Sequence, residues 1–218
     1  IRGTFTLEKR GGLLTQIIKT LRYSFEMNGW INKIGLRNKG IKYAIKKYNI
    51  KSIFNFYKHN IISIAILDEN EIDKFLNKIP DEMNLELNIS CPNIEKKKIE
   101  NNLHKFLNEN RKWCSIKLSP CSKITDIDNF YRQGFRKFHC CNTLPVSRGG
   151  LSGPSLIPYV NNLITEIKTK YPDCEVIAGG GIRKYETLLD YKNKGASHFS
   201  ISTLLFNPFL FSIFYTKW

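Results

Sequence analysis

A thiol and an amine stand where two apolar segments of the sequence end. Cys91, in NISCPN, directly follows one segment and precedes a proline. A thiol with a reference pKa of about 8.5 can act as a general base where its surroundings favour the thiolate; an inert buried thiol is the alternative. Lys117, in SIKLSP, would need an anion or an electron-rich partner if it points inward. A lysine at the edge of a core, with its amine in water, is the other interpretation.

Two glycine and hydroxyl segments near the C-terminus could bind a phosphate. GGGI at 179–182 and IST at 201–203 each follow a β-like run and precede a helical pattern. Backbone N–H groups and helix N-termini bind anions in such loops. Tight turns are the alternative, but two such loops in succession favour a cofactor that carries a phosphate.

Amide side chains follow the same kind of apolar run. Asn88, Asn93 and Asn142 could bind a planar ligand that has carbonyl and N–H edges, although each alone is typical of a turn. His139 and His198 begin no metal-binding motif, so we interpret both as structural.

These residues need elements to position them, and the chain repeats an apolar β-rich run, a loop and an amphipathic helical segment. That alternation predicts a parallel sheet covered by helices. The predicted strands are residues 2–6, 61–67, 83–90, 115–118, 137–142, 175–179 and 198–203. Helical spacing is seen in four stripes: Ile41, Ala44, Ile45 and Tyr48; Ile72, Phe75, Leu76 and Ile79; Ile99, Leu103, Phe106 and Leu107; and Val160, Leu163, Ile164 and Ile167.

Seven βα units are one fewer than a closed eight-stranded barrel has. The distinctive polar residues fall at the carboxyl ends of the predicted strands, where such barrels carry their active sites. We therefore predict an α/β fold of the TIM (β/α)8 barrel type with seven of eight βα units present, and a single domain over 1–218 that lacks its first strand and helix. A doubly wound open sheet is the structural alternative.

Composition excludes several classes of protein. The formal net charge of +15 could indicate a nucleic-acid partner, but the basic residues are spread evenly, and we expect none. The longest apolar stretches are shorter than the ~20 residues of a membrane span. Six cysteines without C-x-x-C pairs are typical of free thiols in a reducing compartment, so we expect a cytoplasmic protein. Cys140 and Cys141 are predicted to lie in the core.

Taken together, the motifs resemble those of the dihydroorotate dehydrogenase family, in order and in spacing. They are ELNISCPN at 86–93, SIKLSP at 115–120, CNT at 141–143, GGLSG at 149–153, AGGGI at 178–182 and IST at 201–203. INKIGLRNKG at 31–40 resembles the family's loop between the second strand and its helix. The resemblance covers essentially the whole chain.

The resemblance implies a (β/α)8 barrel that binds FMN across the strand ends. The cofactor phosphate would lie on Ser152, Gly153, Gly180, Gly181, Ser202 and Thr203, and Lys117 and Asn88 would contact the flavin and its ribityl chain. The pyrimidine would be held by Asn32, the backbone of Gly35 and Leu36, Asn88, Asn93, Asn142 and Thr143.

The implied activity is oxidation of dihydroorotate to orotate in de novo pyrimidine (UMP) biosynthesis, with Cys91 as the base that takes the C5 proton. Cysteine at this position resembles the soluble class 1 enzymes. The electron acceptor stays open between fumarate, a nicotinamide through a partner subunit, and a quinone, and a homodimer is the candidate assembly. The alternatives are a related flavin barrel acting on another dihydropyrimidine and a non-catalytic barrel remnant.

Overall fold

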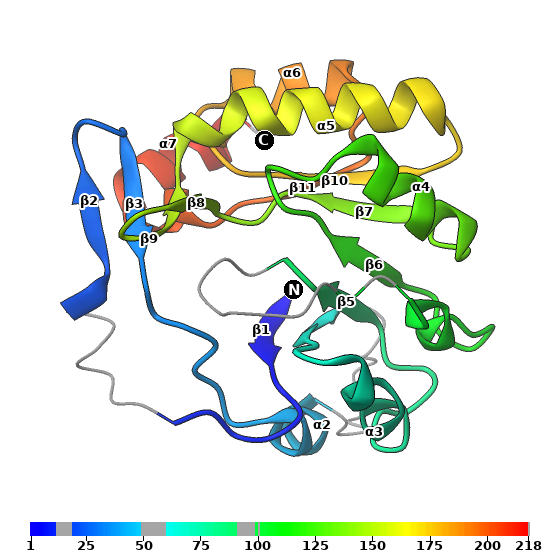
Figure 1. Ribbon diagram of the computed structural model, residues 1–218. Helices are drawn as coiled ribbons and strands as arrows, with labels where there is room; N and C mark the ends of the chain where they lie inside the picture. The colour runs from blue at the N-terminus through cyan, green and yellow to red at the C-terminus, as the bar shows by residue number, and fades with distance from the viewer. Residues whose placement is uncertain (12–18, 49–59, 91–98, 100, 218) are drawn as a thin grey trace.

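A curled sheet of seven parallel strands forms the centre of the molecule (Figure 1). The computed structural model describes residues 1–11, 19–48, 60–90, 99 and 101–217. Within them the strand order is β1-β4-β5-β6-β7-β10-β11. The strands are β1 (Arg2–Phe5), β4 (Ile62–Ala65), β5 (Leu85–Asn88), β6 (Cys114–Lys117), β7 (Lys137–Cys140), β10 (Glu175–Gly179) and β11 (His198–Ser200). All seven lie within or within one residue of the predicted ranges, so the strand predictions are confirmed.

The curl of the sheet distinguishes a barrel from an open doubly wound sheet. Strand order follows chain order with no reversal, whereas a doubly wound sheet reverses direction at a switch point. The Trp113 ring, just before β6, lies 5.0 Å from the His198 ring of β11. Both rings line a cavity of about 480 Å³ that Ile1, Ile61 and Asn84 also reach, from the amino ends of β1, β4 and β5. The predicted barrel fold is therefore confirmed, with β1 and β11 at the edges of the described sheet.

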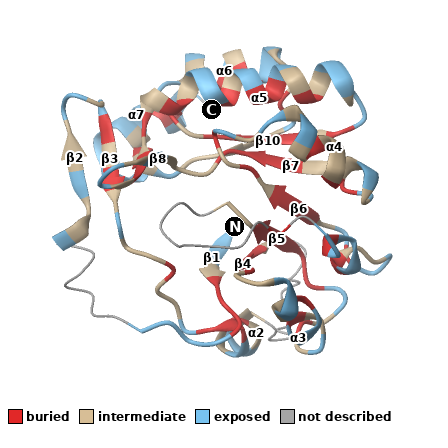
Figure 2. Cartoon of the chain, viewed as in Figure 1, coloured by how far each residue is buried: buried red, intermediate tan, exposed pale blue. Residues whose placement is uncertain are grey.

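Helices cover the outer face of this sheet (Figures 1 and 2). The α-helices are α2 (Ile41–Tyr48), α3 (Ile72–Leu76), α4 (Ile124–Arg132), α5 (Ile157–Lys170), α6 (Tyr185–Asn193) and α7 (Pro208–Lys217). Short 3₁₀ turns are η2 (Glu69–Glu71), η3 (Leu103–Phe106), η4 (Pro154–Leu156) and η5 (Thr203–Phe206). The stripe predicted for α5 is confirmed in full, because Val160, Leu163, Ile164 and Ile167 are all buried.

One predicted helix is wrong in the part that the structure describes. The apolar spacing from Ile99 to Leu107 suggested an α-helix, but the structure has only the 3₁₀ turn η3. Asn102, just before the turn, has a left-handed backbone with φ of 61°, and Leu107 is extended. A continuous α-helix cannot include either conformation. Leu103 and Phe106 are still buried, so the spacing identified core residues correctly.

A second, antiparallel sheet lies to one side of the parallel sheet (Figure 1), and sequence analysis did not predict it. Its order is β2 (Arg22–Ser24), β3 (Gly29–Asn32), β9 (Gly149–Ser152) and β8 (Leu144–Val146). Asn32 of β3 pairs with Gly150 of β9, 118 residues away. Strands of three or four residues with distant partners have too little local pattern to be recognised.

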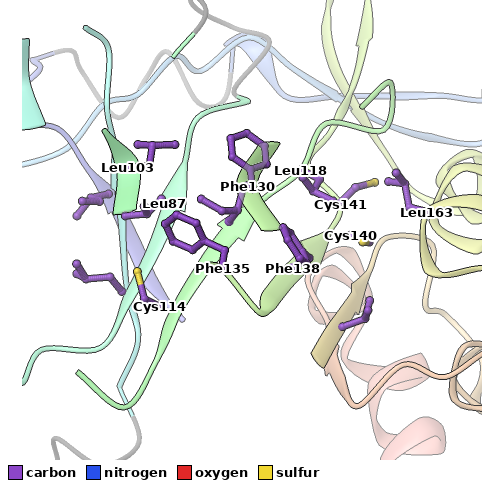
Figure 3. Close-up of a cluster of buried hydrophobic side chains, with 14 of the residues drawn as sticks. Leu87, Leu103, Cys114, Leu118, Phe130, Phe135, Phe138, Cys140, Cys141 and Leu163 are labelled. Carbon is purple, nitrogen blue, oxygen red and sulfur yellow. The ribbon is translucent and has the colours of Figure 1, made fainter. Parts of the chain in front are cut away.

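The core lies between the strands and the helices. Every residue of β4 and β5 is buried, as expected for strands covered on both faces. Figure 3 shows part of this packing, in which Phe138 of β7 lies near Cys140 and Cys141. Both cysteines are buried, as predicted. Phe138 is fully buried as well, and full burial of a phenylalanine side chain contributes roughly 1.5–3 kcal/mol to stability. Among the described helices, none has the length and apolar character that a membrane crossing requires.

Candidate active site

Most of the predicted site residues line one cavity at the carboxyl ends of the strands. Lys117 ends β6, Ser152 ends β9, and the other predicted residues of this cavity follow β7, β9, β10 and β11. Asn88 ends β5 and does not line the cavity itself. The cavity has a volume of about 110 Å³. Its walls include Lys117, Asn142, Thr143, Ser152, Gly153, Gly180, Gly181, Ser202 and Thr203.

The glycine loops of this cavity could form a cradle for a phosphate. Gly153 has a φ of +137° and Gly181 a φ of +73°, conformations that favour glycine. A Cβ added at Gly181 would lie 2.5 Å from Ile157 Cγ1 and 3.2 Å from the Gly153 carbonyl oxygen, so the two loops approach closely because neither carries a side chain. The starts of α5, α6 and the η5–α7 segment follow these loops, and helix N-termini favour anions.

The size of the cavity decides which part of a cofactor it fits. A site that holds a whole small ligand typically measures roughly 300–1,000 Å³, and this cavity is smaller. A cavity of this size could accept a phosphoryl group, and Lys117 lies in its wall.

Hydrogen bonds tie the polar strand ends to one another. The Asn142 Nδ2 group donates to Asn88 Oδ1 at 3.1 Å and to Ser90 Oγ at 3.2 Å. Ser90 Oγ in turn donates to the Lys117 carbonyl oxygen at 2.8 Å. Because three strands are linked in this way, the two amides have fixed orientations from which they could read the edges of a planar ligand.

Lys117 has a charged partner inside the barrel. Its side chain is 20% exposed, and its Nζ lies 3.6 Å from Oε1 of Glu86, which is fully buried. His139 also lines the cavity and lies 2.5 Å from the other Glu86 oxygen. Glu86 was not predicted, and His139 was interpreted as structural. A glutamate within the otherwise apolar run LELN was the available signal, since a buried carboxylate requires partners.

Cys141 also lines the cavity, and its burial disfavours the thiolate form that a base would need. Burial raises the pKa of the Cys141 thiol to about 12, despite the opposing charge of Lys117. The group is therefore a neutral thiol at physiological pH. This agrees with the prediction that it is a core cysteine.

Some predicted residues lie away from this cavity or outside the described part of the chain. Asn32 lies on β3, where its side chain donates to the Gly150 carbonyl oxygen at 3.3 Å. Gly35 and Leu36 follow in the loop after β3 and do not line the cavity. Cys91 and Asn93 lie outside the described residues, and their assignments stay predictions.

Comparison with known proteins identifies the family of the chain. The family model described as dihydroorotate dehydrogenase matches residues 3–213. The catalytic subunit of dihydroorotate dehydrogenase B (NAD(+)) from Staphylococcus carnosus is 28% identical over an alignment that covers 87% of this chain and 71% of that protein. The protein of the same name from Petrotoga mobilis is 28% identical over 94% of this chain and 79% of its own length.

The fold comparison agrees. The crystal structure of DHODH from Eimeria tenella in complex with ferulenol is similar with a TM-score of 0.70 and 16% identity, over 95% of this chain and 70% of that one. At this level of identity, the likeness supports the barrel fold alone. The family match extends over almost the entire sequence. The chain belongs to the dihydroorotate dehydrogenase family.

Proposed function

We propose that this chain oxidises dihydroorotate to orotate with FMN as cofactor, in de novo pyrimidine biosynthesis. The observation that carries the proposal is the convergence of Lys117, Asn142 and the glycine loops on one cavity, in a chain of this family. The cavity offers what the phosphate end of FMN needs, namely close backbone approach and helix N-termini.

Each group of this chain has a distinct part in the proposed reaction. Cys91 would take the proton from C5 of the substrate, and Asn88, Asn93 and Asn142 would hold the pyrimidine by its carbonyl and N–H edges. FMN, when bound, would supply the acceptor for the hydride that leaves C6. The ammonium of Lys117 would contact the flavin and favour negative charge there. Dividing the two hydrogens between a base and a cofactor suits a proton of such weak acidity.

Spectroscopy of the purified protein tests the cofactor and the substrate. We expect visible flavin bands after incubation with FMN, and bleaching of those bands by dihydroorotate under anaerobic conditions. A protein that binds no flavin would be the non-catalytic remnant. Bleaching by dihydrouracil, with no response to dihydroorotate, would assign the chain to the other dihydropyrimidine instead.

A matched pair of cysteine variants tests the base. We expect Cys91→Ala to bind FMN normally and to slow flavin reduction by dihydroorotate by ~10²-fold or more, the scale of general-base contributions. Cys121→Ala, at an exposed cysteine in the loop after β6, is the control and should reduce at the normal rate. Equal rates in the two variants would remove Cys91 from the mechanism.

A further inference from the structure

A buried carboxylate inside the barrel has no part in the reaction proposed above. Glu86 lies in the middle of β5 between two buried leucines, and its side chain is fully buried. Moving an ionised carboxylate out of water is costly unless opposite charge and hydrogen bonds compensate. Its partners should therefore indicate why a charge is kept at this position.

The register of the sheet gathers those partners from the neighbouring strands. Ser63 of β4 is directly opposite Glu86, and Lys117 of β6 is opposite His139 of β7. Side chains alternate between faces with a period of two, so these residues all point to the inside of the barrel. Ser63 Oγ donates to Glu86 Oε1 at 2.9 Å, and Thr4 Oγ1 of β1 donates to Ser63 Oγ at 3.1 Å.

The charges within this group follow from burial and from these contacts. Burial raises the pKa of Glu86, but the positive charge of Lys117 and the hydrogen bonds from His139 and Ser63 outweigh it, and the net pKa is lowered. Burial lowers the pKa of His139, although Glu86 opposes that shift. These shifts favour an anionic Glu86 and a neutral His139, whose Nδ1–H then donates to the carboxylate. Lys117 is then the cation that balances Glu86.

The distance between Lys117 and Glu86 leaves the ammonium available to a ligand. Charge-assisted hydrogen bonds from nitrogen to a carboxylate are about 2.7–2.9 Å long. The Nζ of Lys117 is 3.6 Å from Oε1, close enough for attraction and too far for such a bond. Lys117 also lines the cavity that holds the phosphate cradle, so its ammonium lies between a buried anion and the proposed cofactor.

We propose that Glu86 is a positioning residue that holds the Lys117 ammonium at the wall of the cofactor cavity and limits how strongly that charge favours the reduced cofactor. This inference rests on the proposed function. Reduced flavin carries more negative charge than oxidised flavin, so the positive charge of Lys117 favours reduction. The negative charge of Glu86 opposes reduction through its hold on Lys117.

The reduction potential of bound FMN tests this role, because a purely structural residue would not change it. In Glu86→Gln we expect the ratio of reduced to oxidised flavin at a fixed solution potential to rise about tenfold. That corresponds to a shift of the reduction potential of about +30 mV for a two-electron couple. Glu86→Asp keeps the charge but withdraws it from Lys117, and should shift the potential in the same direction by less. Glu109→Gln, at an exposed glutamate between η3 and β6, is the control and should match the wild type.

A double-mutant cycle shows whether Glu86 acts through Lys117. In a Lys117→Met background we expect Glu86→Gln to have no further effect on the potential, since the charge that it positions is gone. A wild-type potential in Glu86→Gln, or a shift that persists without Lys117, would overturn the inference. If Glu86→Gln cannot be purified, a wild-type potential in Glu86→Asp would overturn it equally. Wild-type protein without any bound flavin would instead overturn the proposed function, and this inference with it.

Discussion

Replacing Gly181 by alanine should disturb the phosphate cradle at a defined point. Gly181 follows β10 with a φ of +73°, and the added methyl would meet Ile157 Cγ1 at 2.5 Å. A left-handed backbone costs a non-glycine residue roughly 1–2 kcal/mol, and overpacking typically costs about 1–3 kcal/mol. We therefore expect the free energy of unfolding to fall by ~2–5 kcal/mol. For a chain of this length that corresponds to a decrease in Tm of roughly 5–15 °C.

The same substitution should weaken binding of FMN more than binding of riboflavin. The relaxed loop would move the backbone N–H groups of Gly180 and Gly181 away from the position proposed for the phosphate. A hydrogen bond to a charged group is worth roughly 1.5–3 kcal/mol, so we expect the Kd for FMN to rise by about 10- to 100-fold. Riboflavin has no phosphate, and its Kd should change little. Quenching of flavin fluorescence on titration of the apoprotein measures both constants.

Two other glycines separate the contributions to the loss of stability. Gly35 has a φ of +68° and open space around its missing Cβ, so Gly35→Ala should cost only the backbone penalty. Gly11 has open space and no left-handed backbone, and Gly11→Ala should be close to neutral. If Gly181→Ala loses no more stability than Gly35→Ala, the added methyl group does not clash with Ile157. If the affinities for FMN and riboflavin fall equally, the loop does not bind the phosphate.

Three further predictions concern charged side chains. Arg183 donates to Asn28 at 3.3 Å and lies beside the cradle. Arg183→Gln should therefore weaken FMN binding about fivefold (~1 kcal/mol) and leave riboflavin binding unchanged. Lys184→Gln, at an exposed site, is the control and should alter neither. Arg111 is buried and donates to the carbonyl oxygens of three residues before β5 and β6. Arg111→Met should therefore lower the free energy of unfolding, measured with denaturant, by ~2–6 kcal/mol. Arg132→Met, at an exposed site, is the control and should change it little. Because the pKa of Glu86 is lowered in the folded protein, the stability that its carboxylate contributes is complete above the unfolded pKa of about 4.3 and is lost as the pH falls. Below that pH, the free energy of unfolding of Glu86→Gln should therefore depend less on pH than the free energy of unfolding of the wild type.

Local patterns in the sequence were sufficient to predict the seven strands and the residues at their carboxyl ends. Apolar runs such as ISIAIL are properties of neighbouring residues, and parallel strands have to be buried on both faces wherever they lie. Asn88 and Lys117 follow two such runs, so their position at one edge of the sheet could be expected. The same local reading failed at 99–107, where apolar spacing predicts burial but cannot reveal the left-handed residue that prevents an α-helix.

The contacts within the site depended on the register between strands, which no local pattern specifies. The sequence by itself determined that Glu86 interrupts an apolar run and that Lys117 ends one. Only the tertiary structure decided that Ser63, Glu86 and His139 meet in the barrel interior, across 23 and 53 residues of chain. The physical reason is that a shift of one residue in strand pairing would turn these side chains to the outer face, and that pairing is set by the packing of the entire barrel.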